Sequence, residues 1–215
     1  MDLQRNPSHA NLQRHAPLAY LQRSSSLALL ALFFAAPLTG CGYNGLVESD
    51  EAVKAGWAQV ENVYQRRSDL IPNLVNTVKG SAAHEEKVLE EVTTARASAT
   101  QIKISADDLS DPAKVKAFEE AQSKLSGSLG RLIATSENYP DLKANAAFRD
   151  LQGQLEGTEN RIATERKRFN DAVEAYNVKV RSFPTTVVAK FTGFKVRETF
   201  HATTANAEKP PEVKF

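Results

Sequence analysis

Apolar and aromatic side chains recur at alternating spacings of three and four residues, which is the pattern of one face of an α-helix. The first such run covers residues 53–78 and continues to residue 102. Its stripe begins with Val53, Trp57, Val60, Tyr64, Ile71, Leu74 and Val78. Arg67 interrupts this stripe, and Pro72 lies inside the run. Because proline cannot donate a backbone hydrogen bond, we expect a kink at Pro72, or a new helix that starts there after Ser68 or Asp69 as cap.

A second long helix is predicted to begin at Asp111 and Pro112. Aspartate is a favoured N-cap, and proline is favoured at the first helical position. The apolar stripe covers residues 115–132, and the helix should end before Asn138-Tyr139-Pro140-Asp141, because a proline disfavours helix in the residue before it. We interpret Tyr139 with the following Pro140 as an interhelical turn, or as an exposed contact loop.

A third long helix is predicted over residues 142–182. Its stripe runs from Phe148 to Phe183, with Thr158 and Glu165 as polar members. The repeat is close to 3.5 residues, which favours helices that pack at crossing angles of about 20°. The pattern therefore predicts an all-α fold, an antiparallel bundle of about four long helices.

The N-terminal segment has the features of an export signal. Arg5, Arg14 and Arg23 precede a charge-free apolar stretch over residues 27–38. That stretch is followed by Leu38-Thr39-Gly40-Cys41, which resembles a bacterial lipobox. We therefore predict a signal peptide over residues 1–40 and a lipid on Cys41, the sole cysteine.

An uncleaved anchor is the alternative, because residues 27–47 carry no charge and match the length of a spanning helix. Both interpretations place the following domain outside the cytoplasm, since the arginines precede the apolar segment and Glu48 and Asp50 follow it. The expected location is the cell membrane or outer membrane. We divide the rest of the chain into a short linker (41–47), the bundle (48–200) and a flexible tail (201–215).

The composition restricts the candidate chemistry. With 27 basic and 26 acidic residues, the chain is not expected to bind nucleic acid, and we interpret the run Arg166-Lys167-Arg168 as a solvated helix face. A single cysteine allows no internal disulfide and no cysteine-based zinc site. His84 begins a segment like a zinc-protease motif, but Val88 replaces the second histidine. We therefore predict no enzyme, metal or cofactor site.

Charged residues on the apolar stripes are the main candidate site. Arg67 lies on the stripe of the first helix, Glu165 lies on that of the last, and Glu159 lies near it. Because an unpaired buried charge is costly, we expect Arg67 to pair with one of these glutamates between helices. Such a pair could fix the register of the helices or form a polar notch for a partner. A third possibility is that the long arginine reaches solvent.

Several segments, in order and at consistent spacing, resemble the LemA family. They include Arg67-Ser68-Asp69-Leu70-Ile71-Pro72-Asn73, Glu137-Asn138-Tyr139-Pro140-Asp141-Leu142 and Leu155-Glu156-Gly157-Thr158-Glu159-Asn160-Arg161-Ile162. The resemblance implies an antiparallel helical bundle after an N-terminal membrane segment, and partners in membrane assemblies. It adds Asp69, Pro72, Asn73, Tyr139 and Asn160 to the candidate structural or interaction residues. The lipobox departs from the usual family pattern.

The function predicted from the sequence is that of a membrane-anchored, non-enzymatic bundle of the cell envelope. It would act as a scaffold or regulatory partner of an unidentified envelope protein. The alternative is a ligand- or peptide-binding module that uses a polar notch between helices near Arg67 and Glu165.

Overall fold

The computed structural model describes the backbone of residues 19–80 and 86–201, and their side chains from residue 42 onward. Within these ranges the fold is all-α, as predicted. The helices are α1 (Ala19–Gly80), α2 (Glu86–Gln101), the 3-10 helix η1 (Asp107–Ser110), α3 (Pro112–Ser136), α4 (Pro140–Ala144), α5 (Ala146–Arg181) and α6 (Thr185–Thr192). Among the described residues, no helix is both long and apolar enough to span a bilayer.

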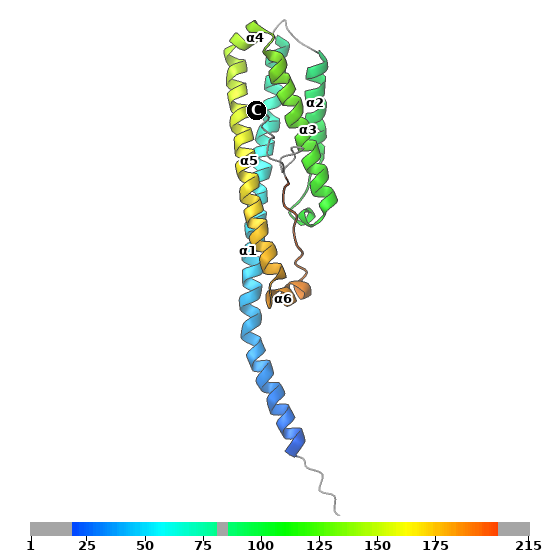
Figure 1. The fold of residues 1–215 in the computed structure, drawn as a ribbon, viewed down its shortest axis with the longest axis vertical. Helices are drawn as coiled ribbons and strands as arrows, with labels where there is room; N and C mark the ends of the chain where they lie inside the picture. Colours follow the sequence, from blue (N-terminus) through cyan, green and yellow to red (C-terminus); the bar gives the residue numbers. More distant parts are fainter. Residues whose placement is uncertain (1–18, 81–85, 202–215) are drawn as a thin grey trace, which may run out of the picture. The chain divides into compact units, whose positions relative to one another are not determined.

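The chain divides into two compact units, Met1–Cys41 and Gly42–Phe215. In the first unit the structure describes only backbone, the helical residues from Ala19 to Cys41. The predicted lipid on the Cys41 side chain, the first part of the predicted signal peptide and the predicted tail from residue 202 lie outside the described residues. The second unit is a bundle in which successive long helices run in alternating directions (Figure 1).

Helix α1 does not break at Pro72 but continues to Gly80. A proline at this position cannot donate to the carbonyl of Ser68, four residues earlier. Arg96 of α2 makes up for the loss, because its Nε donates to the Ser68 carbonyl oxygen at 2.9 Å. The separation of the first two helices falls between Gly80 and Glu86 instead.

The predicted start of α3 is confirmed. The Asp111 carboxylate accepts from the backbone N–H of Ala113 at 3.0 Å, and Pro112 is the first helical residue. The third predicted segment divides into the short helix α4 and the long helix α5. Asn145 caps α5 in the same way, and its side chain accepts from the N–H of Ala147 at 2.9 Å.

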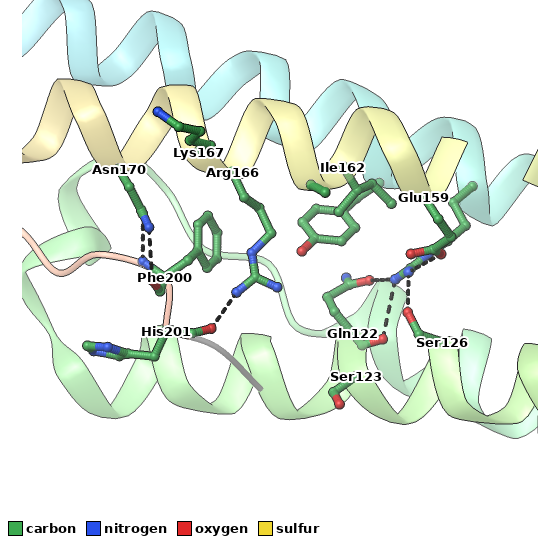
Figure 2. Close-up of a pocket in the computed structure, with 13 residues that line it drawn as sticks. Gln122, Ser123, Ser126, Glu159, Ile162, Arg166, Lys167, Asn170, Phe200 and His201 are labelled. Atoms are coloured by element: carbon green, nitrogen blue, oxygen red, sulfur yellow. Dashed lines mark hydrogen bonds and ion pairs between the residues drawn. The ribbon is translucent and has the colours of Figure 1, made fainter. Parts of the chain in front are cut away.

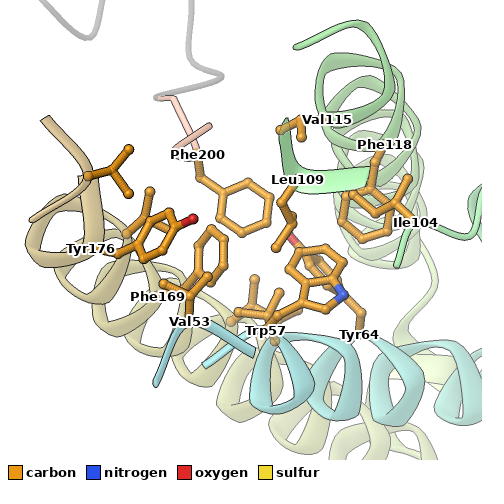
Figure 3. Packing of buried hydrophobic residues seen from close by; sticks show 14 of the residues in the cluster. Val53, Trp57, Tyr64, Ile104, Leu109, Val115, Phe118, Phe169, Tyr176 and Phe200 are labelled. Atoms are coloured by element: carbon orange, nitrogen blue, oxygen red, sulfur yellow. The ribbon is translucent and has the colours of Figure 1, made fainter. Parts of the chain in front are cut away.

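Two hydrophobic clusters fill the bundle. One lies toward α4 and is mainly aliphatic; the other is rich in aromatic residues (Figure 3). In the aromatic cluster, the ring of Trp57 lies 5.5 Å from Phe118, 5.6 Å from Phe169 and 5.9 Å from Phe200, measured between ring centroids. Such aromatic pairs add about 0.5–1.5 kcal/mol each beyond their buried area. These contacts join α1, α3 and α5 to a segment near the C-terminus.

That segment, residues 194–201, follows α6 without helical structure, and we refer to it as the strap. The amide of Asn177 donates to the carbonyl of Arg197 and accepts from its N–H, at 2.8 and 2.9 Å. Asn170 holds Phe200 in the same two-point way, at 2.9 and 2.8 Å. Seven helical residues and three extended residues both span about 10 Å, so the two asparagines match the strap in spacing.

Candidate functional site

Arg67 lies in the middle of the bundle, where three helices meet. Its side chain is 1% exposed. Nη1 donates to the Ser126 hydroxyl at 2.6 Å and to Glu159 Oε1 at 2.7 Å, and Nη2 donates to Gln122 Oε1 at 2.5 Å. The expected pairing of Arg67 with a glutamate is thus confirmed for Glu159. The guanidinium ties α1 to both α3 and α5.

The surroundings of Arg67 reduce the cost of burying its charge. Glu159 supplies the opposite charge while its own side chain is 43% exposed and therefore hydrated. The guanidinium carbon lies 5.1 Å from the centroid of the Tyr64 ring, a favourable cation–π position. Burial raises the pKa of the Tyr64 hydroxyl, and the nearby positive charges of Arg166 and Arg67 oppose that rise. Tyr64 is therefore neutral at physiological pH.

Glu165 does not take part in this site. Its carboxylate accepts from Nη1 of Arg168 at 2.8 Å, within the same helix. Six residues separate it from Glu159, which is a rotation of about 600° and turns Glu165 to a different face. Arg166, seven residues from Glu159, lies on the face that carries Glu159 instead (Figure 2).

Arg166 forms a second polar cluster beside the first. Its Nη2 donates to Glu119 Oε1 and to the carbonyl oxygen of His201, each at 2.9 Å. The same Glu119 oxygen accepts from the backbone N–H of His201 at 2.9 Å. The Arg166 guanidinium carbon lies 4.5 Å from the Phe200 ring centroid. The interpretation of the basic run as solvated holds for Lys167 and Arg168, but Arg166 fastens the end of the strap to α3.

A notch of about 460 Å³ opens between these two clusters (Figure 2). Its walls include Arg67, Glu159 and Arg166, together with Ser123 and Lys167. Both arginines already bind carboxylates of the chain. The notch can therefore accept a polar group on its rim, but a ligand that reached the buried guanidinium groups would have to displace internal partners.

The remaining predicted residues do not gather at the notch. Asp69 is exposed and accepts from the Gln65 amide at 2.8 Å. Asn73 and Asn160 are exposed, and their backbone carbonyl oxygens accept from the hydroxyls of Thr77 and Thr164, four residues later in each helix. Tyr139 precedes α4 and packs against the aliphatic cluster, which agrees with a turn. These residues lie on exposed helix surfaces or at a turn, and they do not form a common site.

A second buried ion pair was not predicted. Arg197 of the strap donates from Nη2 to Asp50 Oδ1 at 2.6 Å, and both side chains are 9% exposed. Lys54 contacts the other Asp50 oxygen at 2.9 Å, and hydrogen bonds to Glu51 and then to Asp50 raise the Lys54 pKa. Extending the apolar stripe backward from Val53 would have placed position 50 inside the bundle. The burial of Arg197 could not be predicted in this way, because the strap is not helical and has no apolar period.

The fold and the buried arginine contacts define an all-α bundle held together by internal ion pairs. The model of the LemA family matches residues 56–215 of this chain. The chain therefore belongs to the LemA family.

Its relatives include magnetosome proteins. The chain is 29% identical over 175 residues to Magnetosome protein MamQ of Magnetospirillum gryphiswaldense, which covers 74% of this chain and 64% of that protein. It is 28% identical over 174 residues to Magnetosome protein MamQ 2 of Paramagnetospirillum magneticum, with the same coverage. It is 22% identical over 147 residues to Protein LemA of Metamycoplasma hominis, covering 68% of this chain and 63% of that protein. The chain thus spans about 64% of the length of the MamQ relatives. Family and relatives together indicate a membrane-associated protein.

Proposed function

We propose that this protein is a membrane-anchored, non-enzymatic bundle that acts as a scaffold or regulatory partner of an assembly in the cell envelope. The observation that carries the proposal is how the chain uses its buried and half-buried charges. Arg67, Arg166 and Arg197 each bind a carboxylate of the same chain, at 2.7, 2.9 and 2.6 Å. Buried groups committed in this way fix helix register rather than await a substrate.

The rigidity of the bundle supports the same proposal. Two hydrophobic clusters fill it along its length. The hydrogen bond of Arg67 to Ser126 connects α1 with α3, and two ion pairs connect α1 with α5 and the strap. A filled bundle keeps its surface features at fixed separations. It can therefore hold a partner at a set distance from a membrane without changing shape.

The anchor is part of the proposal: a lipid on Cys41 would hold the bundle at the membrane, facing away from the cytoplasm. Replacing Cys41 with Ala should abolish incorporation of labelled fatty acid. Replacing Gly42 with Ala, next to it, should leave incorporation intact. Equal labelling of the Cys41→Ala variant would show that Cys41 does not carry the lipid.

In-cell crosslinking tests the scaffold itself. Photoreactive side chains placed at exposed positions on α5, such as Arg161, and on α3, such as Lys116, should capture the same envelope protein reproducibly. The matched control is the same label on a chain that carries Phe169→Ala, which weakens the core and should reduce capture. Capture of no envelope protein above background from any exposed face would contradict the proposal.

Peptide binding is the second candidate function, and the strap favours it. The bundle already holds an extended segment of its own through two-point contacts from Asn170 and Asn177. The strap reaches the notch at His201, so a peptide from a partner could extend the same track along Ser123 and Lys167. Lys167→Glu should then weaken capture of that partner, whereas Lys116→Glu, away from the notch, should not.

A further inference from the structure

Large apolar side chains are exposed at one end of the bundle. Among the described side chains they are Tyr43, Val178, Phe183, Val187, Phe191 and Val196, which we refer to as the apolar collar. Phe183 and Phe191 are 84% and 88% exposed. All of them lie at the start of the bundle in α1, at the end of α5, or in and just after α6. Two phenylalanines left this bare are unusual unless something covers them.

Gly42 and Tyr43, at the start of the bundle, lie close to α6 and the residues just after it. A Cβ added to Gly42 would lie 3.9 Å from both Thr185 Oγ1 and Val188 Cγ2 of α6. The Tyr43 ring lies 6.2 Å from that of Phe194, just past α6. Residue 42 follows Cys41 directly in the chain, and the apolar stretch over residues 27–38 ends four positions before Gly42. Whichever anchor operates, its covalent connection leaves from the collar.

The segment that carries all of the collar except Tyr43 is basic, as in a surface that meets anionic lipid. Residues 175–197 contain five basic residues and no acidic one. Of the five, Arg197 is engaged with Asp50, while Arg181, Lys190 and Lys195 are exposed. Apolar side chains flanked by lysine and arginine are typical of segments that lie in the interface of an anionic membrane. Long basic side chains can also bury their stems there and keep their charge at the headgroups.

We propose that the apolar collar docks into the headgroup region of an anionic bilayer, with Phe183 and Phe191 inserted, and holds the bundle upright on the membrane. This rests on the proposed membrane association and goes beyond it, because an anchor alone would leave the bundle free to tilt. The depth is limited by α1: Glu48 lies about 9 Å along the helix from Gly42, and its charge remains outside the apolar layer.

Depth-dependent quenching by brominated lipids tests the docking. The full chain is reconstituted in vesicles that contain phosphatidylglycerol, with Phe191→Trp in one variant and Arg149→Trp in the other. Arg149 is exposed in the first turn of α5, at the end of that helix away from α6. The native Trp57 is buried in both, so its emission is subtracted by measuring the unsubstituted chain. Phe183→Trp provides a second collar position.

The collar variants should lose most of the added emission to brominated lipid and shift to shorter wavelength, while Arg149→Trp should do neither. Vesicles of phosphatidylcholine alone should weaken the quenching. If the protein floats with the vesicles but the collar indoles are not quenched, docking is wrong and membrane association stands. A blue shift without quenching, together with a crosslinked dimer, would assign the collar to a second copy of the chain instead. Failure to float with the vesicles would overturn the proposed membrane association and the docking together.

Discussion

The middle of the bundle and its α6 end treat polar and apolar groups in opposite ways. In the middle, a guanidinium is buried to 1% exposure and every charge that it meets belongs to the chain. At the α6 end, phenylalanines are left bare on the surface. Burying a charge and exposing a large apolar ring are both unfavourable for an isolated protein. The cost of burying the charge is offset by partners inside the molecule. The proposed docking to a membrane would offset the cost of exposing the rings.

We infer that the buried charges serve stability, whereas the exposed rings serve binding. Substitutions of the buried charges, Arg67 in the middle and Asp50 near the α6 end, should change the free energy of unfolding and leave binding surfaces intact. Substitutions in the apolar collar should leave the free energy of unfolding unchanged and alter what the protein binds. The predictions below follow this contrast, from the largest expected loss of stability to the smallest.

Asp50→Asn should cause the largest loss among the substitutions of charged residues, about 3 kcal/mol, because it leaves Arg197 buried without its counter-charge. Both members of that pair are 9% exposed, so water cannot replace the carboxylate. Urea unfolding of the full chain, followed by circular dichroism, measures the change. Glu51→Gln is the matched control, since Glu51 is exposed and should cost less than about 0.5 kcal/mol. Equal losses of unfolding free energy in the two variants would show that the Asp50–Arg197 ion pair does not stabilise the fold.

Arg67→Ala should cost about 2 kcal/mol, because it removes the charged hydrogen bonds that connect α1 with α3 and α5. The loss is smaller than at Asp50, since the remaining Glu159 is partly exposed and can be hydrated. The same unfolding experiment applies, with the exposed neighbour Arg66→Ala as control. An unchanged midpoint for Arg67→Ala would mean that the buried guanidinium contributes nothing to stability.

Glu159→Gln should cost about 1 kcal/mol, because Arg67 keeps Gln122 and Ser126 as acceptors and the new amide oxygen can still accept. Glu156→Gln, an exposed position three residues earlier on the same helix, serves as reference. A loss at Glu159 as large as that at Asp50 would show that neither water nor the new amide can replace the Glu159 carboxylate as a partner of Arg67.

Phe191→Ser should change the free energy of unfolding by less than about 0.5 kcal/mol, since its ring is 88% exposed. Phe169→Ala, in which the ring is 1% exposed, should cost about 3 kcal/mol and shows what a buried phenylalanine contributes. A large loss for Phe191→Ser would mean that the collar is part of the folding core.

Much of the middle could be predicted from the sequence. Arg67 is a charge at a position where the helical period requires an apolar residue, so its burial and need for a partner followed directly. The choice of Glu159 over Glu165 did not follow, because small deviations from a 3.5-residue period accumulate along a helix of 36 residues. The contacts of Arg67 with the neutral acceptors Gln122 and Ser126 could not be predicted either, since such residues are equally common on solvated helix faces.

Less of the α6 end could be predicted. The strap has no period, and its contacts are to backbone groups that every sequence has, so no local pattern indicated that Asn170 and Asn177 hold it. Asp50 was interpreted only as a charge that sets membrane topology. The continuation of α1 through Pro72 depends on Arg96 of another helix, which local rules for proline do not consider.

On the proposed function, the buried charges hold the bundle together and are not a binding site. The most direct test is the variant Arg67→Met with Glu159→Gln, which removes the ion pair while filling its space with a flexible apolar chain. In cells, with the photoreactive group at Arg161, the folded variant is compared with the unsubstituted chain. We predict the same captured envelope protein in the same amount. Loss of that protein while circular dichroism shows an intact bundle would contradict the claim and identify the notch as the site of binding.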